Sequence, residues 1–347
     1  MQLEEQVPLA PWTTLGIGGP ARWFAHVADE SALAEGVRLA RDRGLPLFVL
    51  GGGSNLLVSD EGFPGVVLHI AMQGIEQAGD VFHAAAGEDW DPFVSLAIER
   101  GYGGLECLAG IPGTVGGTPV QNVGAYGQEV STIITAVRVF DLHHLTFSEL
   151  PASACGFAYR RSIFNTSHRG RFVVTRVSYR LRRNAHPVLS YPDLKRHFEN
   201  RAEPPSLTEA ADAVRSIRHT KGMLLVEGDP DCRSAGSFFK NPVVPEADYD
   251  QIAAEASAPV PRYVATHGFV KIPAAWLVEQ TGFHKGYTLG AAGISSRHTL
   301  AIVNRGGATA KEILTLRDQI VAAVDARFRI RLEQEPVWVA PDSALNR

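Results

Sequence analysis

Three consecutive glycines, Gly51, Gly52 and Gly53, follow an apolar run at residues 45–50 that has the pattern of a buried strand. Glycines let the main chain turn tightly and aim N–H groups at an anion such as a pyrophosphate. A second extended segment follows the triplet where a dinucleotide-binding βαβ unit would open a helix, so main-chain amides would hold the anion without a helix N-terminus. A plain tight turn is the alternative interpretation of the triplet alone.

Glycine is concentrated again between residues 101 and 127, where it fills nine of 27 positions, compared with 34 of 347 in the whole chain. Residues 107–127 contain no Asp, Glu, Lys or Arg, while Pro112 and Pro119 exclude a membrane helix. Interleaved Leu, Ile, Val and Tyr argue against a flexible linker. We interpret the segment as a folded, neutral loop whose backbone can approach a dinucleotide closely. A glycine-rich set of hairpin turns is the alternative.

Several segments in one order carry a resemblance to a known family. They read TTLGIGG at 13–19, LGGGSN at 50–55, GLECLAGIPGTVGGTPVQNVGAYGQE at 104–129, FAYRRSIF at 157–164 and GSFFKNP at 236–242. They resemble the corresponding segments of UDP-N-acetylenolpyruvoylglucosamine reductases, and with the C-terminal pieces they cover most of the chain. The LGGGSN segment alone would fit many flavoproteins of the vanillyl-alcohol-oxidase type, whereas the long segment together with GSFFKNP is specific to this family.

The resemblance implies a flavoenzyme of peptidoglycan precursor synthesis. In this family NADPH reduces non-covalently bound FAD, and the flavin N5 hydride reduces the enolpyruvyl ether of a UDP-sugar to the lactyl ether of UDP-N-acetylmuramate. It also implies that the two glycine-rich segments hold FAD, through Gly51, Gly52, Gly53, Ser54, Asn55, Pro112, Gly113, Gly116, Gly117, Gln121, Asn122 and Gly124.

Two residues resemble the family's charge-stabilising pair. Arg160, in FAYRR, matches the catalytic arginine, and a guanidinium that stays charged is suited to the negative charge of an enolate. Glu335, in RLEQEP, matches the C-terminal glutamate. An ionised carboxylate would repel an enolate, so this role requires a raised pKa or a bridging hydrogen bond. The sequence leaves both alternatives open.

The resemblance implies that Ser237, in GSFFKNP, donates the proton that the substrate carbon takes up. Lys240, three residues later, could help to tune this serine as a proton donor. The C-terminal motif departs from the family, because Glu335 is followed by Pro336 and Val337 where Val and Arg are usual. Glu333 could serve in place of Glu335. We keep Glu335 because its spacing from the preceding leucine matches the family.

Substrate-binding residues also follow from the resemblance. Tyr191, in SYPDL at 190–194, matches a loop that closes over the nucleotide sugar in the type I form of the family, and Arg218 and Lys221 match diphosphate-binding cations. Both cations also lie near the C-terminus of an expected helix, where the helix dipole favours positive charge in any case. Further contacts are expected from Tyr126, Asn241 and His298.

Composition excludes several other classes of protein. Lys and Arg total 33 against 37 Asp and Glu, so a net charge of −4 argues against a protein devoted to coating nucleic acid. Eight arginines between residues 160 and 183 could bind an anion or form a solvated strand face. The three cysteines and twelve histidines form no metal-ligand motif, so we expect no metal site and a reducing, cytoplasmic location. We also expect no signal peptide, no membrane insertion, and a monomer.

The expected fold is α+β, with a two-lobed FAD-binding domain of the vanillyl-alcohol-oxidase type and a smaller α+β substrate-binding domain. Lobe 1 would span 1–70 and be completed by 330–347, lobe 2 would span 71–222, and the substrate-binding domain 223–329. Apolar stripes and capping residues predict helices at 31–43, 206–221 and 309–328. Two rivals remain: another oxidase or dehydrogenase of the same FAD fold, and a non-catalytic flavin- or nucleic-acid-binding module.

Overall fold

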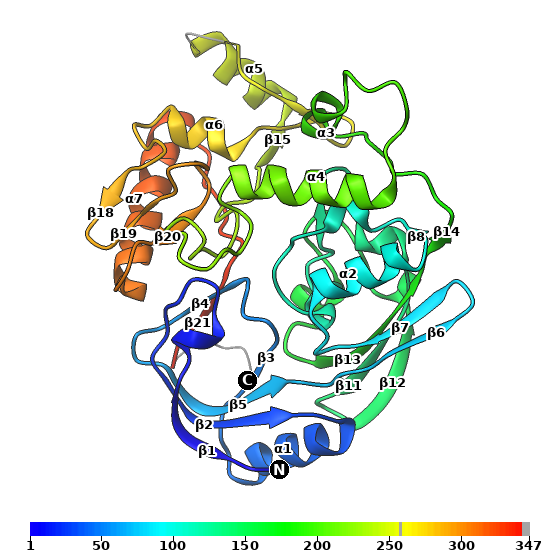
Figure 1. The fold of residues 1–347 in the computed structure, drawn as a ribbon. Helices are drawn as coiled ribbons and strands as arrows, with labels where there is room; N and C mark the ends of the chain where they lie inside the picture. The colour runs from blue at the N-terminus through cyan, green and yellow to red at the C-terminus, as the bar shows by residue number, and fades with distance from the viewer. Residues whose placement is uncertain (257–258, 342–347) are drawn as a thin grey trace.

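The computed structural model describes residues 1–256 and 259–341, so the end of the predicted segment 330–347 lies outside the described residues. The N-terminal sheet has the strand order β1-β2-β5-β3, in which β2 and β3 both run parallel to β5 and β1 is antiparallel to β2. Its strands are β1 (Glu4–Pro8), β2 (Pro20–Val27), β3 (Leu47–Leu50) and β5 (Phe63–Ile70). Figure 1 shows this sheet in blue at the bottom, with α1 (Glu30–Asp42) beneath it.

Helix α1 forms where the apolar stripe predicted it. The Asp29 side chain accepts a hydrogen bond from the Ala32 N–H and caps its start, and Leu33, Val37 and Ala40 are buried against the sheet. The glycine triplet follows β3, and β4 (Leu56–Val58) comes next instead of a helix. Strand β4 pairs in parallel with β21 (Val337–Val339), which joins the end of the chain to its beginning.

A five-stranded antiparallel sheet forms the second part of the molecule, on the right of Figure 1. Its order is β12-β11-β13-β7-β6, with strands β6 (Ile75–Ala78), β7 (Val81–Ala85), β11 (Ile134–Asp141), β12 (Thr146–Pro151) and β13 (Phe172–Arg180). Helix α2 (Trp90–Glu99) lies between β7 and β11 in the chain, and α3 (Pro192–His197) and α4 (Leu207–Thr220) follow β13. Two short antiparallel pairs join β8 (Tyr102–Gly103) to β14 (Arg182–Arg183) and β9 (Gly124–Ala125) to β10 (Gln128–Glu129).

The third part holds two small three-stranded sheets and three helices. One sheet joins β15 (Val243–Pro245), β16 (Tyr263–Val264) and β17 (Phe269–Lys271), and the other joins β18 (Thr288–Leu289), β19 (Ala292–Ile294) and β20 (Ile302–Asn304). The helices are α5 (Glu246–Glu255), α6 (Ala274–Glu279) and α7 (Ala310–Phe328). Capping boxes start α4 at Ser206 and α7 at Thr309, as the sequence predicted.

Buried side chains form three clusters. The largest joins α1, α2 and the five-stranded sheet, a second fills the C-terminal part around α7, and a small third one lies between the N-terminal sheet and the β4–β21 pair. The segments that carry the predicted site residues lie where these parts meet. Within residues 1–256 and 259–341, no helix is both long and apolar enough to cross a membrane.

Candidate active site

The glycine triplet and the second glycine-rich segment lie against each other. A Cβ on Gly52 would be 2.6 Å from the Gly113 Cα, and a Cβ on Gly113 would be 2.7 Å from the Ser54 Oγ. Gly53 has a φ of +63°, and a Cβ there would lie 1.8 Å from the Trp12 carbonyl oxygen. Only glycine therefore allows these two loops to approach and turn as they do.

A buried hydroxyl marks the space between these loops. Thr114 Oγ1 is buried and has no hydrogen-bond partner among the described residues, and a Cβ on Gly51 would lie 3.1 Å from it. The neighbouring Gly117 has open space around its Cβ position. A cradle of glycine backbone beside an unsatisfied hydroxyl fits an anionic dinucleotide such as the predicted FAD. The predicted contacts Pro112, Gly116, Gln121 and Gly124 belong to the same segment and are partly buried.

The structure brings Arg160 and Glu335 together from distant parts of the chain. The Arg160 Nε lies 3.1 Å from the Glu335 Oε1, and its Nη2 donates to the Gly124 carbonyl oxygen at 2.8 Å. Arg160 has a φ of +55°, a conformation that side-chain-bearing residues rarely adopt, and the Asn165 side chain donates to its carbonyl oxygen. Burial raises the pKa of Glu335, although Arg160 and Lys240 act in the opposite direction.

The segment that carries Ser237 is bound to Glu335 through the main chain. The Glu335 N–H donates to the Phe238 carbonyl oxygen at 2.9 Å, and the Asn55 side chain donates to the Glu335 carbonyl oxygen at 3.2 Å. The site thus joins the glycine-triplet loop, the Ser237 segment and the C-terminal segment. Glu333, the alternative carboxylate, instead pairs with Lys240 at 2.5 Å and has a side chain that is 72% exposed.

Proline at 336 fits this arrangement. The Val337 N–H donates to the Asn55 carbonyl oxygen, and the Pro336 carbonyl oxygen accepts from the Gln334 side chain. The missing N–H of proline thus costs none of these hydrogen bonds, and strand β21 begins at the next residue.

A group of aromatic rings and one cation forms a second part of the site. The Tyr126 and Tyr191 rings meet edge to face with centroids 5.2 Å apart, and the Lys221 Nζ lies 5.8 Å from the first centroid and 6.0 Å from the second. Lys221 Nζ also pairs with Asp193 at 2.5 Å. Tyr191 is exposed and Tyr126 is buried, so the ammonium is placed at the edge of an aromatic surface.

Arg218 is buried and His298 is partly buried, so both side chains lie below the surface of the site. The Arg218 guanidinium donates to the carbonyl oxygens of Gly110 and Met223 at 2.9 and 2.6 Å, so it links α4 to the glycine-rich loop. Burial, followed by Lys221, Lys285 and Arg218, lowers the pKa of His298 to about 4. Its Nδ1 accepts from the Leu300 N–H, which leaves the proton of the neutral ring on Nε2.

Two predicted contact residues use their amide groups within the protein. Asn122 donates to Glu129 and to the Ala158 carbonyl oxygen, next to the Arg160 turn. Asn241 accepts from the Ala274 N–H at the start of α6. Their contacts with cofactor and substrate stay predictions.

Sequence reasoning missed Tyr159, Asp193 and Thr114. The Tyr159 ring contacts two cations: the Arg160 Cζ lies 5.3 Å from its centroid, and the Lys271 Nζ lies 4.1 Å from it. The signal for Tyr159 and Asp193 was present, because both belong to the quoted FAYRR and SYPDL segments. Their partners, however, come from distant elements. Thr114 carried a signal only through its place within the glycine-rich segment.

Comparison with known proteins assigns the family. Residues 21–143 match the FAD binding domain family, and residues 229–339 match the C-terminal domain family of UDP-N-acetylenolpyruvoylglucosamine reductase. A reductase of this name from Thermobifida fusca is 45% identical over 96% of this chain and 97% of its own, and one from Streptomyces coelicolor is 43% identical over 96% and 89%. The chain belongs to the UDP-N-acetylenolpyruvoylglucosamine reductase family.

A solved member of the UDP-N-acetylenolpyruvoylglucosamine reductase family supports the same assignment. The crystal structure of the Thermus caldophilus reductase superposes with a TM-score of 0.67 at 29% identity, over 98% of this chain and 99% of that one. The predicted α+β fold with an FAD-binding domain is confirmed, as is FAD as the cofactor. Both rivals, a different flavin oxidase and a non-catalytic module, are thereby set aside.

Proposed function

We propose that this protein reduces the enolpyruvyl ether of UDP-N-acetylglucosamine enolpyruvate to UDP-N-acetylmuramate, with NADPH as the source of reducing equivalents. The observation that carries the proposal is the meeting of Arg160, Glu335 and the Ser237 segment beside the glycine-triplet loop. Bound FAD would supply the hydride. The loops at 51–55 and 112–124 would hold it through main-chain N–H groups and the Thr114 hydroxyl.

Arg160 would stabilise the negative charge that develops on the substrate carboxylate as hydride reaches the vinyl carbon. Its guanidinium is fixed by Gly124 on one side and Glu335 on the other, so it needs little reorganisation during the reaction. Burial raises the pKa of Glu335, which is the direction that a carboxyl beside an enolate requires. This supports the first of the two alternatives that the sequence left open.

Ser237 would then deliver the proton to carbon. Its side chain is partly exposed, and the backbone hydrogen bond between Glu335 and Phe238 fixes its segment relative to the carboxyl. A serine hydroxyl is a weak acid, but an enolate carbon is a strong enough base to take its proton when the two are held in contact.

The nucleotide sugar would bind at the aromatic group of Tyr126 and Tyr191. Lys221 would exchange its contact with Asp193 for a diphosphate oxygen, and the His298 Nε2–H would donate to the same region. Arg218 would add positive charge from beneath, and Asn241 would complete the contacts near Tyr159. The Tyr191 segment would close over the ligand, and its side chain is exposed and free to contact one.

The domain boundaries remain part of the proposal. Lobe 1 would span residues 1–70 with the C-terminal strand, lobe 2 residues 71–222, and the substrate-binding domain residues 223–329. The parallel pairing of β21 with β4 supports the first of these assignments. We also propose that the protein acts as a monomer in the cytoplasm, where its three free, buried cysteines stay reduced.

An anaerobic assay tests the function directly. Purified protein with NADPH and the enolpyruvyl nucleotide sugar should yield a product heavier by two hydrogens, with one NADPH consumed for each product. An unchanged substrate mass would reject the proposed reaction. Rapid reoxidation of the flavin by oxygen alone would indicate an oxidase instead.

A further inference from the structure

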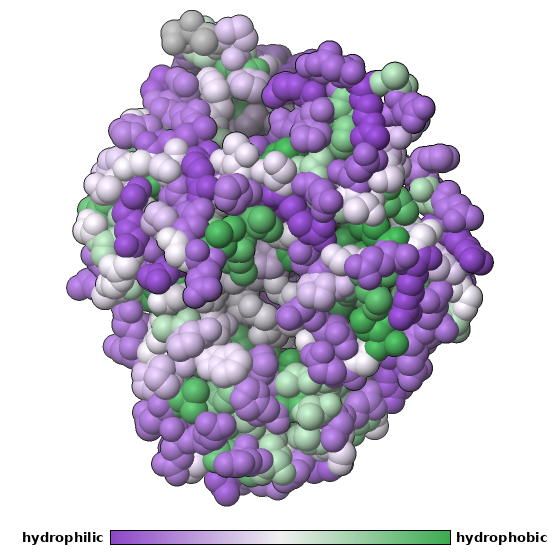
Figure 2. All heavy atoms as spheres, in the orientation of Figure 1, coloured by the Kyte–Doolittle hydropathy of each residue, from purple (hydrophilic) through white to green (hydrophobic). Residues whose placement is uncertain are grey.

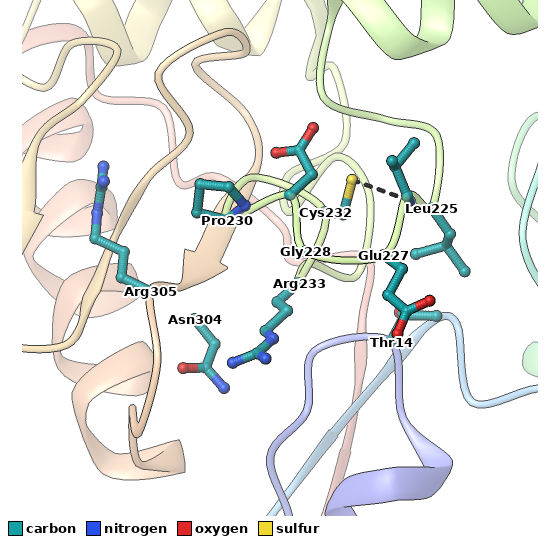
Figure 3. A pocket seen from close by; sticks show the side chains of 11 residues that line it. Thr14, Leu225, Glu227, Gly228, Pro230, Cys232, Arg233, Asn304 and Arg305 are labelled. Carbon is teal, nitrogen blue, oxygen red and sulfur yellow. Dashed lines mark hydrogen bonds between the residues drawn. The ribbon is translucent and has the colours of Figure 1, made fainter.

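The loop between α4 and β15 carries Ser237 near its end but is poorly packed on one side. Residues 225–228 are exposed, and they border a cavity of about 520 Å³ that also has Thr14, Asn304 and Arg305 in its wall. Figure 3 shows the Arg233 and Asn304 side chains close to each other in this region, and the Asn304 N–H donates to the Arg233 carbonyl oxygen at 2.9 Å. Figure 2 shows hydrophobic atoms at the surface where the loop crosses the middle of that face. Packing therefore does little to position residues 225–228, whereas the Thr14 hydroxyl holds the later part of the loop by donating to the Ser234 carbonyl oxygen at 2.6 Å.

One guanidinium holds the loop through Asp229 and Asp231. Arg297 Nε lies 3.1 Å from the Asp231 Oδ2, and its Nη2 pairs with Asp229. The remaining nitrogen, Nη1, donates to the His219 carbonyl oxygen at 2.9 Å. Ser296 adds two hydrogen bonds to Asp231, from its N–H at 3.1 Å and from its hydroxyl at 2.6 Å. The Asp231 side chain is only 6% exposed, so this is a largely desolvated ionic cluster.

The close approach of the guanidinium requires Gly222. A Cβ at this position would lie 3.0 Å from the Arg297 Nε and 3.1 Å from the Asp231 Cβ, and the residue has a φ of +64°. Gly222 directly follows Lys221, so the end of α4 turns around the Arg297 side chain. The cluster therefore fixes the end of α4 and the Asp229–Asp231 turn relative to each other.

Three segments of the proposed site meet at this cluster. His298 follows Arg297 in the chain, Lys221 lies two residues after His219, whose carbonyl Arg297 binds, and Ser237 lies six residues after Asp231 on the same loop. Arg297 contacts none of these three side chains in the described hydrogen bonds and ion pairs.

We infer that Arg297 is a positioning residue that sets the distance between Ser237 and the bound substrate by fastening the Ser237 loop to the end of α4. The inference rests on the proposed function. A displacement of about 1 Å at a reacting group can cost ~10²-fold in rate. Lysine keeps the charge but not the planar fork that reaches Asp229, Asp231 and the His219 carbonyl together. The protonation step, and not flavin binding, should therefore depend on the guanidinium.

The variant Arg297→Lys tests this in stopped-flow experiments on the FAD-loaded enzyme. Reoxidation of the reduced flavin by saturating enolpyruvyl substrate should slow by at least about tenfold, while flavin content stays at the wild-type level. The matched control is Arg171→Lys, which alters another arginine that binds an aspartate through Nε and Nη2, at the β11–β13 edge. The control should reoxidise at the wild-type rate.

A double variant that combines Arg297→Lys with Ser237→Ala distinguishes an effect on the position of Ser237 from a general loss of activity. If Arg297 acts through Ser237, adding Arg297→Lys to Ser237→Ala should slow reoxidation by less than about threefold further, because these effects are coupled. A full, multiplicative loss would overturn the inference, as would a wild-type rate for Arg297→Lys alone. If Arg297→Lys does not fold, Asp229→Asn is used instead, because it keeps the Arg297–Asp231 ion pair. A wild-type reoxidation rate for Asp229→Asn, or a full multiplicative loss when it is added to Ser237→Ala, would again overturn the inference. A wild-type enzyme that the substrate cannot reoxidise would instead reject the proposed function.

Discussion

At the scale of single residues, Ser237 separates the two halves of the proposed reaction. Ser237→Ala should leave the reduction of FAD by NADPH near the wild-type rate and slow reoxidation by the substrate by about 10²–10⁴-fold, because a positioned acid contributes that much. Stopped-flow absorbance at the flavin band follows each half alone. Ser167→Ala, at an exposed turn, is the matched control. Equal slowing of both halves would contradict the proton-donor role.

His298 provides a second prediction, on stability against pH. Its pKa of about 4 in the folded protein lies below the usual 6.5, because burial disfavours the charged ring. Between these values the unfolded chain binds a proton that the folded chain does not, so the free energy of unfolding falls as the pH drops from 6.5 to 4. At about 1.4 kcal/mol per pKa unit, this loss amounts to roughly 3 kcal/mol.

The variant His298→Gln should therefore lose less stability than the wild type on acidification. Thermal midpoints measured at pH 7 and pH 4.5 give the comparison, with the exposed His143→Gln as control. The same acid-induced loss in His298→Gln and wild type would show that this ring is not held neutral by the fold.

Some predicted residues could be recognised from their own segment of sequence, whereas the contacts of others depend on distant segments. Arg160, Ser237 and Glu335 could be named because their segments are distinctive, and in the structure Arg160 pairs with Glu335 while the main chain of Glu335 binds Phe238, next to Ser237. The inward direction of Arg218, towards the carbonyl oxygens of Gly110 and Met223, could not be predicted, since it depends on where α4 lies against a distant loop. The Lys221–Asp193 pair likewise joins residues 28 positions apart.

At the scale of elements, helices α1, α4 and α7 were predictable because their caps and apolar stripes are encoded within each segment. The small sheets of the third part were not, because strands of two or three residues carry too little periodicity to recognise. The 107–127 segment was correctly expected to be folded, and its order comes from short turns and backbone hydrogen bonds.

The glycine-triplet loop gives a prediction about cofactor retention. Gly53→Ala would place a Cβ 1.8 Å from the Trp12 carbonyl oxygen, so the loop must move and the FAD-to-protein ratio after gel filtration should fall at least about tenfold. Gly79→Ala is a close control, because Gly79 has a φ of +61° in the β6–β7 turn but open space around its Cβ position. If the two variants retain equal FAD, the close approach at Gly53 has no part in binding.

At the scale of the whole molecule, bound FAD should stabilise the folded protein against unfolding. Acid precipitation should release the flavin into the supernatant, because the proposed contacts are non-covalent. Flavin-free protein should melt at a lower temperature, and added FAD at 100 times its Kd should restore about 2.7 kcal/mol of stability. Flavin that stays in the precipitate, or a melting temperature indifferent to FAD, would contradict this.

The parallel pairing of β21 with β4 also has a consequence for synthesis on the ribosome. The hydrogen bond from the Asn55 side chain to the Glu335 carbonyl oxygen cannot form until Glu335 is synthesised, 280 residues after Asn55. At roughly 5–20 residues per second, that delay is about 14–56 s. Throughout it, the nascent chain has its glycine-triplet loop but neither the partner strand of β4 nor the carboxyl that faces Arg160. A polypeptide released before residue 335 would contain most of the fold and still lack the carboxyl that pairs with Arg160 in the proposed active site.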